Sequence, residues 1–246
     1  MPCVYRSRVF VVALTLFSAS ALADWSHQSG STQTALVELY TSQGCSSCPP
    51  ADRWLSMFKD RDDLWTSVVP VAWHVTYWDY LGWRDPFGRR ENDQRQRHMA
   101  TAAASGVYTP GMFLNGSEYR YWRGVRSAEV ASGAEQVGEL HAKAKGSQVT
   151  IRFEPSEAVQ LKAPSVELVF LRSDRTTDVK HGENRGRKLQ HDFIAGVPSK
   201  IDLAADGGVW VGNLSKRPDE DAVAVALWVT NHEGRYLQAT GGWLNH

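Results

Sequence analysis

Apolar runs and helix-like segments alternate in the first part of the chain. Residues 35–40 are apolar apart from Glu38, and residues 67–74 form a second apolar run. Both runs have the length of a buried strand. Between them, the segment that holds Trp54, Leu55 and Phe58 has the apolar spacing of a helix. The pattern therefore predicts a strand–helix–strand unit.

The alternation continues as far as residue 145. A polar stretch predicts a helix over residues 89–105. Pro110 stands at the entrance of a short apolar strand that ends in an Asn-Gly turn, and residues 119–123 alternate as its returning strand should. Ser127 is a suitable N-cap for a helix over residues 127–145, which a glycine then ends.

Beyond residue 146 the helical period disappears. Short β-like runs follow, separated by proline, glycine and charged turns. These runs are residues 149–153, 166–171, 188–194, 209–211 and 223–230. The change of period predicts an α/β domain over residues 24–146 and a small all-β, sandwich-like domain over residues 147–246.

The first 23 residues have the layout of a secretory signal peptide. Arg6 and Arg8 precede an apolar run over residues 9–17, and residues 21–23 have the small-x-small form of a cleavage site. Cleavage near Ala23 would leave a periplasmic or secreted protein. We expect no membrane span, because no segment reaches the roughly 20 apolar residues that spanning requires.

Net charge and composition limit the classes of partner that the protein could bind. Removing residues 1–23 would change the formal net charge from 27 − 27 = 0 to 25 − 27 = −2. This balance offers no basic surface for nucleic acid. Hydrophobic residues make up 42% and charged residues 22%, as in an ordinary globular protein. Because Cys3 would be removed as well, Cys45 and Cys48 would be the remaining thiols.

Cys45 and Cys48 lie between the first predicted strand and the helix that follows it. Unpaired N–H groups and the positive end of the dipole at a helix start favour thiolate over thiol. This position favours redox chemistry. The alternative is a structural disulfide, but it would close too short a loop to add much stability.

The order of elements, with Cys-x-x-Cys before a helix and Thr109-Pro110 before a later strand, resembles the thioredoxin fold. More specifically, residues 38–52, 74–83 and 182–187 resemble signature blocks of the secreted, thioredoxin-like family called domain of unknown function 1223. The resemblance implies an α/β thioredoxin-like domain, with a central mixed sheet and helices on both faces, followed by the small all-β domain.

The resemblance also implies roles for individual residues. Cys45 would be the exposed nucleophile and Cys48 the resolving thiol, and together they would form the redox disulfide. Pro110, if cis, would present the backbone of Thr109 to an extended substrate segment. Glu38, an acid within an apolar strand, would accept the proton of Cys48. The alternative is a salt-bridged structural glutamate.

Four further residues are candidates for the same site. His74, at the end of the second strand, could carry protons, bind a metal or simply be packed. Trp78 and Trp83 could grip a peptide or a small thiol compound, or could cover the core. Arg185, within a family block, could anchor a carboxylate or backbone carbonyls.

The predicted function is thiol–disulfide exchange with protein or small-thiol partners, through Cys45 and Cys48 and without a cofactor. The alternative is copper binding or chaperoning, because Cys45, Cys48 and His74 offer two sulfurs and one nitrogen, a set suited to Cu(I). In a third interpretation, the all-β domain binds a partner and the thiols take no part.

Overall fold

A computed structural model describes residues 24–200, 209–214 and 221–244. The predicted signal peptide, residues 1–23, lies outside the described residues, so cleavage and export stay predictions. Within the described ranges, no helix is both long and apolar enough to cross a membrane.

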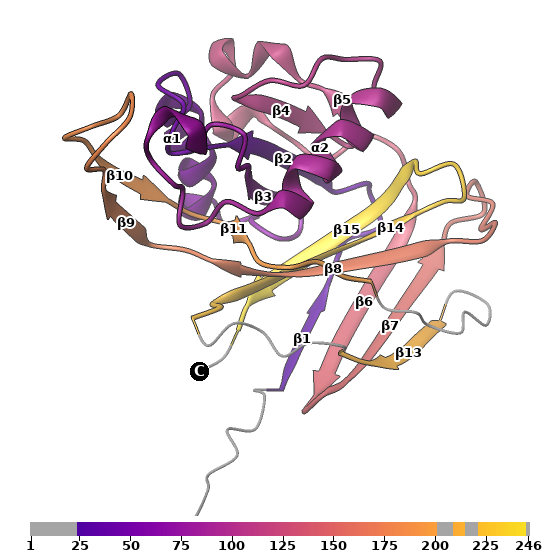
Figure 1. The fold of residues 1–246 in the computed structure, drawn as a ribbon. Coiled ribbons are helices and arrows are strands. Elements are labelled where there is room, and N and C mark those ends of the chain that lie inside the picture. The colour runs from indigo at the N-terminus through magenta and orange to yellow at the C-terminus, as the bar shows by residue number, and fades with distance from the viewer. Residues whose placement is uncertain (1–23, 201–208, 215–220, 245–246) are drawn as a thin grey trace, which may run out of the picture.

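Strands dominate the architecture, and most of them belong to one nine-stranded sheet (Figure 1). Its strands in spatial order are β15 (Tyr236–Trp243), β14 (Ala224–Thr230), β8 (Ser165–Arg172), β11 (Ile194–Ala195), β3 (Val68–His74), β2 (Ala35–Thr41), β4 (Gly111–Leu114) and β5 (Ser117–Glu118), with β12 (Ser199–Lys200) also paired to β8. β3 runs parallel to both β2 and β11, and the other pairs are antiparallel.

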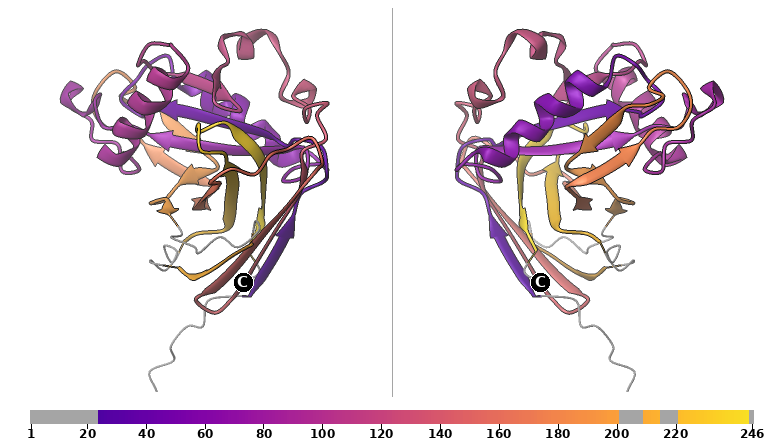
Figure 2. Two further views of the ribbon diagram at one scale, coloured as in Figure 1. Left: turned by 90° about the vertical axis from the view of Figure 1, so that its right-hand side faces the viewer. Right: turned by 90° about the vertical axis from the view of Figure 1, so that its left-hand side faces the viewer.

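A second sheet and a separate hairpin complete the strands. The second sheet has the order β1 (Trp25–Gln28), β6 (Gly138–Lys145), β7 (Gln148–Pro155) and β13 (Val209–Asn213), and the hairpin joins β9 (Arg175–Asp178) to β10 (Lys188–His191). The helices are α1 (Pro49–Ser56) and α2 (Arg90–Ala102), with short 3-10 turns η1 (Met57–Asp60), η2 (Asp79–Leu81), η3 (Arg120–Gly124) and η4 (Ser127–Glu129). Figure 2 shows the helices gathered at one end of the molecule and the four-stranded sheet toward the other.

β14 takes part in two hydrophobic cores, because successive side chains of a strand point to opposite faces of its sheet. Ala226 and Trp228 pack into the core that includes β2, β3 and α1, whereas Leu227 and Val229 pack into the core beneath the four-stranded sheet. A strand buried on both faces reads as an unbroken apolar run.

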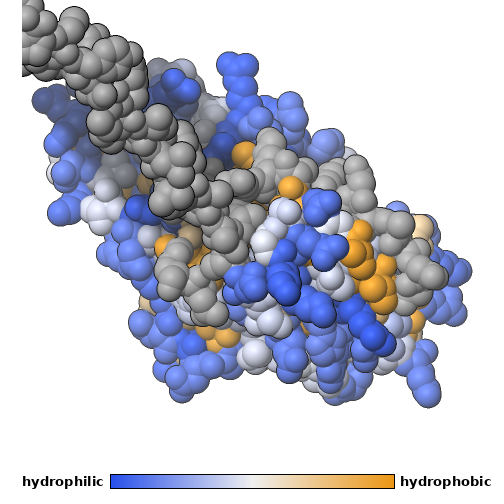
Figure 3. All heavy atoms as spheres, turned by 90° about the horizontal axis from the view of Figure 1, so that it is seen from below, coloured by the Kyte–Doolittle hydropathy of each residue, from blue (hydrophilic) through white to orange (hydrophobic). Residues whose placement is uncertain are grey.

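Where described residues are visible from below, Figure 3 shows a mostly hydrophilic surface with small separate apolar areas.

The predicted fold class is wrong. We expected an α/β thioredoxin-like domain, with helices on both faces of a central mixed sheet, and a separate small β sandwich. The described residues instead form fifteen strands and two α-helices. The large sheet takes β2, β3, β4 and β5 from before residue 146, and β8, β11, β12, β14 and β15 from after it. β11 and β8 extend the sheet beyond β3. The division into residues 24–146 and 147–246 stays a prediction.

The predicted helix over residues 127–145 is also wrong. The chain makes the short turn η4 and then β6, in which Leu140 and Ala142 are buried while Glu139 and Lys143 are exposed. That burial has a period of two, which is the period of a strand. β6 pairs along its whole length with β7, and this pairing outweighs the local helix signals.

Most other elements match their patterns. The strands expected at residues 35–40 and 67–74 are confirmed as β2 and β3, and the helix expected at 89–105 is confirmed as α2. The returning strand expected at residues 119–123 is instead the 3-10 turn η3, with only Ser117–Glu118 pairing as β5.

Candidate functional site

The Cys45–Cys48 disulfide lies just after β2, with its Cα atoms 5.5 Å apart. Cys48 is the N-cap residue of α1, and its carbonyl accepts hydrogen bonds from the amides of Ala51 and Asp52. Two prolines fill the first two positions of the helix. Because proline has no N–H, the helix start holds fewer free donors for a thiolate than its position suggests.

Cys45 is buried, contrary to the expectation of an exposed nucleophile. Its exposed fraction is 2% and that of Cys48 is 0%, while Ser46 and Ser47 between them are exposed. The hydroxyl of Ser47 lies 3.3 Å from Sγ of Cys45. A disulfide sulfur carries no hydrogen, so Ser47 is the donor, and its hydroxyl is available to a Cys45 thiolate after reduction.

Residues 179–187, the covering loop between β9 and β10, contact the cysteine turn at residues 43–48. Asn184, which is fully buried between β9 and β10, donates from Nδ2 to the carbonyl oxygens of Gln43 and Cys45, both at 2.9 Å. The carboxylate of Glu183 accepts a hydrogen bond of 3.0 Å from the amide of Ser46. The two sequence blocks that hold these residues are therefore in direct contact. Asn184 and Glu183 clamp the cysteine turn.

Sequence reasoning chose Arg185 in this block and missed its neighbour. The side chain of Arg185 is exposed, whereas Asn184 reaches the backbone carbonyls that an arginine was expected to anchor. A neutral amide among charged residues was the one available signal for this role. Amide N–H groups are strong donors to carbonyl oxygens and bring no charge into a buried site.

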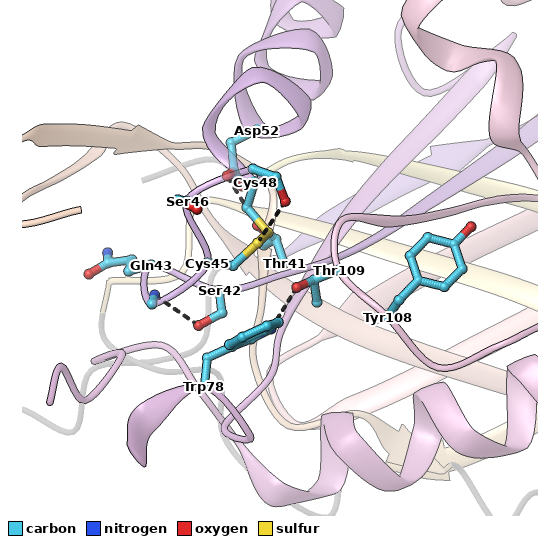
Figure 4. The surroundings of a disulfide bond; sticks show 12 residues. Thr41, Ser42, Gln43, Cys45, Ser46, Cys48, Asp52, Trp78, Tyr108 and Thr109 are labelled. Atoms are coloured by element: carbon cyan, nitrogen blue, oxygen red, sulfur yellow. Dashed lines mark hydrogen bonds between the residues drawn. A yellow bond between two sulfur atoms is a disulfide. The ribbon is translucent and has the colours of Figure 1, made fainter. Parts of the chain in front are cut away.

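The Thr109–Pro110 peptide bond is cis and lies at the same edge of the sheet as the disulfide (Figure 4). The next residue, Gly111, pairs with Tyr40 near the end of β2. The indole N–H of Trp78 donates to Oγ1 of Thr109 at 2.7 Å. Trp78 thus connects the loop that holds Thr109 and Pro110 to the site. The roles of these three residues toward a substrate stay predictions.

Trp83 supports the cysteine turn from the other side. Its indole N–H donates to Oε1 of Gln43 at 3.0 Å, and Nε2 of Gln43 donates to the hydroxyl of Thr177 in β9 at 3.0 Å. The amide of Gln43 donates to Asp85 at 2.8 Å. Gln43, which sequence reasoning did not single out, therefore connects three parts of the site.

His74 ends β3 and is fully buried, with Nδ1 2.8 Å from Oδ2 of Asp85. Its ring packs edge-on against His191, the last residue of β10, with centroids 4.8 Å apart. Nδ1 of His191 lies 3.4 Å from Oδ1 of Asp52. That separation is long for a hydrogen bond and describes an ion pair. Oδ2 of Asp52 accepts from the hydroxyl of Thr41 at 3.0 Å.

Carboxylates determine the charge of this buried cluster. Burial alone would lower the pKa of His191, but the negative charges of Asp52, Asp85 and Asp192 outweigh it and raise the pKa above its ordinary value. Burial would raise the pKa of Asp85, yet His74 and two backbone amides lower it. The cluster therefore favours positive charge beside its carboxylates.

The hydrogen-bond partners of Glu38 are residues other than the cysteines. Its carboxylate accepts hydrogen bonds from the indole of Trp73 at 3.0 Å, from Nη2 of Arg95 at 2.9 Å and from the hydroxyl of Tyr236 at 2.9 Å. These contacts are those of a salt-bridged structural glutamate, and its role as proton acceptor stays a prediction. Asp52 is the carboxylate on the same helix as the Cys48 cap (Figure 4).

The sequence profile of the family described as "Protein of unknown function (DUF1223)" matches residues 36–230. The chain belongs to the DUF1223 family. The match spans the cysteine turn, the histidine cluster and the covering loop, so these parts lie within the family's common region. No curated protein matches the chain.

Two solved structures are similar to this DUF1223 protein. The X-ray crystal structure of protein AGR_C_4864 from Agrobacterium tumefaciens has a TM-score of 0.59 and 25% sequence identity, over 87% of this chain and 94% of that chain. HBP35 of Porphyromonas gingivalis has a TM-score of 0.56 and 14% identity, over 88% of this chain and 76% of that chain. The second likeness is one of fold alone.

Proposed function

We propose that this protein exchanges disulfides with protein or small-thiol partners through Cys45 and Cys48. One observation carries the proposal: the disulfide lies at the cap of α1, and the cis Thr109–Pro110 bond lies at the same edge of the sheet. Ligands of sheets with parallel strands gather at the carboxyl ends of those strands. The arrangement puts a reactive bond beside backbone that an extended partner segment can pair with.

The exchange needs two partner thiols. A partner thiolate attacks Sγ of Cys45, the bond to Cys48 breaks, and Cys48 leaves as a thiolate at the helix cap, where the dipole stabilises it. A second partner thiol, after losing its proton, attacks the mixed disulfide and releases the Cys45 thiolate. Two electrons pass from the partner to the protein, and the partner leaves as a disulfide. The reverse sequence oxidises the protein's dithiol.

Access to Cys45 depends on the covering loop. Because Cys45 is 2% exposed and the loop is bonded to its carbonyl through Asn184, the loop must move before a protein partner reaches the sulfur. The exposed Ser46 and Ser47 mark the side from which a partner approaches.

The copper alternative has less support. It needs His74 together with both cysteines, but the two sulfurs are joined in a disulfide. Within the described part of the chain, the group of donor atoms that converges around His74 includes Asp52 and His191, and neither cysteine.

The test uses single cysteine variants in an exchange assay with a disulfide-linked fluorescent peptide. Cys45→Ser is expected to abolish exchange, and Cys48→Ala to accumulate a mixed disulfide on Cys45 that mass spectrometry detects. Exchange at the wild-type rate in Cys45→Ser, with the variant folded, would overturn the proposal.

A matched pair of serine variants tests the chemistry at Cys45. Ser47→Ala is expected to slow exchange about five-fold, because one hydrogen bond to the thiolate contributes roughly 1 kcal/mol. Ser46→Ala serves as the control, since the contact of Ser46 with Glu183 is made by its backbone amide and survives the change. Equal rates in the two variants would contradict a role for the hydroxyl of Ser47.

A further inference from the structure

We propose that Asp52, His74 and His191 bind a divalent first-row transition-metal ion. The three residues come from α1, β3 and β10, so they converge only in the folded chain. One donor atom of each lies within 4.8 Å of the others, and the residues are 5%, 0% and 1% exposed. The site is separate from the disulfide, and the proposal does not depend on thiol exchange.

Both histidines have nitrogen atoms left for a ligand. Nδ1 of His74 is engaged with Asp85, and its buried Nε2 has no hydrogen-bond partner within the described residues. Both ring nitrogens of His191 are likewise buried, and within the same part of the chain neither makes a hydrogen bond, so either can serve as the donor. Buried polar atoms are usually paired, because leaving one unpaired costs roughly 1–3 kcal/mol. A metal ion gives such a nitrogen a partner.

The spacing is close to that of a metal centre. With ligands at roughly 2.1 Å in tetrahedral geometry, donor atoms of a zinc site lie roughly 3.4 Å apart. Asp52 Oδ1 and His191 Nδ1 already lie 3.4 Å apart. The widest separation in the cluster, up to 4.8 Å, exceeds that spacing by roughly 1.4 Å, and rotation of an imidazole ring would shorten it.

Residues around the three ligands provide the usual support. Metal-bound histidines commonly donate their other N–H to a carboxylate, which orients the ring. Asp85 takes that position at Nδ1 of His74, and Thr41 holds the second oxygen of Asp52. These contacts leave Nε2 of His74 and Oδ1 of Asp52 available to an ion.

The donor set selects the class of metal. Imidazole nitrogen suits zinc, iron, copper and nickel, whereas magnesium and calcium require mostly oxygen ligands. The carboxylates of Asp52 and Asp85 lie close enough to His191 to act on its charge, and negative charge beside the imidazoles favours a bound dication. A bound ion would also join α1, β3 and β10, one helical turn from Cys48.

The test titrates zinc alone into the full chain in its disulfide form, with no affinity tag, after chelator treatment. A chromophoric chelator competes with the protein for zinc, and its absorbance reports how much zinc the protein binds. We expect one zinc ion per chain and a rise in Tm on binding. His191→Ala is expected to weaken binding at least 100-fold. His181→Ala, an exposed histidine between β9 and β10, is the matched control and keeps wild-type affinity.

Three results would overturn the proposal: no zinc bound, unchanged affinity in His191→Ala, or loss of zinc in a Cys45→Ser, Cys48→Ser double variant. Should His191→Ala not fold, Asp85→Asn replaces it, because removing the orienting carboxylate is expected to weaken zinc binding 10–100-fold. Unchanged zinc affinity in folded Asp85→Asn would overturn the proposal in that case.

Discussion

Replacing Asn184 by alanine removes the buried side chain that holds the β9–β10 loop on the cysteine turn. Its Nδ2 donates to the carbonyls of Gln43 and Cys45, and its Oδ1 accepts a hydrogen bond from Arg187. Asn184→Ala leaves both carbonyl oxygens without this donor. The loop then opens more readily, and the disulfide beneath it becomes easier to reach.

The cost follows from the two lost hydrogen bonds. The carbonyl of Gln43, left unpaired, costs roughly 1–3 kcal/mol, and the lost bond to Cys45, whose carbonyl keeps the amide of Cys48 at 3.3 Å, adds roughly 1 kcal/mol. We expect the free energy of unfolding to fall by about 3 kcal/mol. For a chain of this size that corresponds to a Tm lower by roughly 6–12 °C.

Two measurements check this prediction: urea unfolding of the oxidised protein, and the rate at which dithiothreitol reduces the disulfide. Reduction is expected to be faster in Asn184→Ala. Asn184→Asp is expected to be less stable than Asn184→Ala, because a carboxylate would face two carbonyl oxygens without a donor. Asn213→Ala, an exposed asparagine in β13, is the control. A loss below about 1 kcal/mol with an unchanged reduction rate would refute the reasoning.

Two further predictions concern stability and are measured by the same urea unfolding. Glu38→Gln is expected to lower the free energy of unfolding by roughly 3 kcal/mol, because Arg95 loses a buried counter-ion. Glu139→Gln, on the exposed face of β6, is the control and is expected to change this free energy little. Equal effects of the two substitutions would contradict a structural role for Glu38. Gly241→Ala is expected to cost roughly 1–3 kcal/mol, because its Cβ would meet a carbonyl oxygen at 2.5 Å and an indole ring at 2.6 Å. Gly124→Ala, with open space around it, is the control, and a Gly241→Ala protein as stable as this control would contradict the packing.

Local sequence patterns were enough to predict much of the secondary structure between residues 35 and 102. β2, α2 and β3 lie close to where the spacing of apolar residues predicts them, and the cysteine pair lies at the start of α1. These elements are set by neighbours a few residues apart in the chain, so periodicity reveals them. The β-like run at residues 223–230 was likewise expected to be a strand, and it forms β14.

Only the tertiary structure decided how the second part of the chain joins the first. Residues 138–145 carry helix signals, yet pairing with β7 makes them a strand. Asn184 and Cys45 are 139 residues apart, and His191 meets Asp52 through the same hairpin. The sequence by itself determined where the thiols and several strands, among them β2 and β3, lie. Which distant residues cover the thiols depended on strand pairing, because those contacts leave no spacing pattern along the chain.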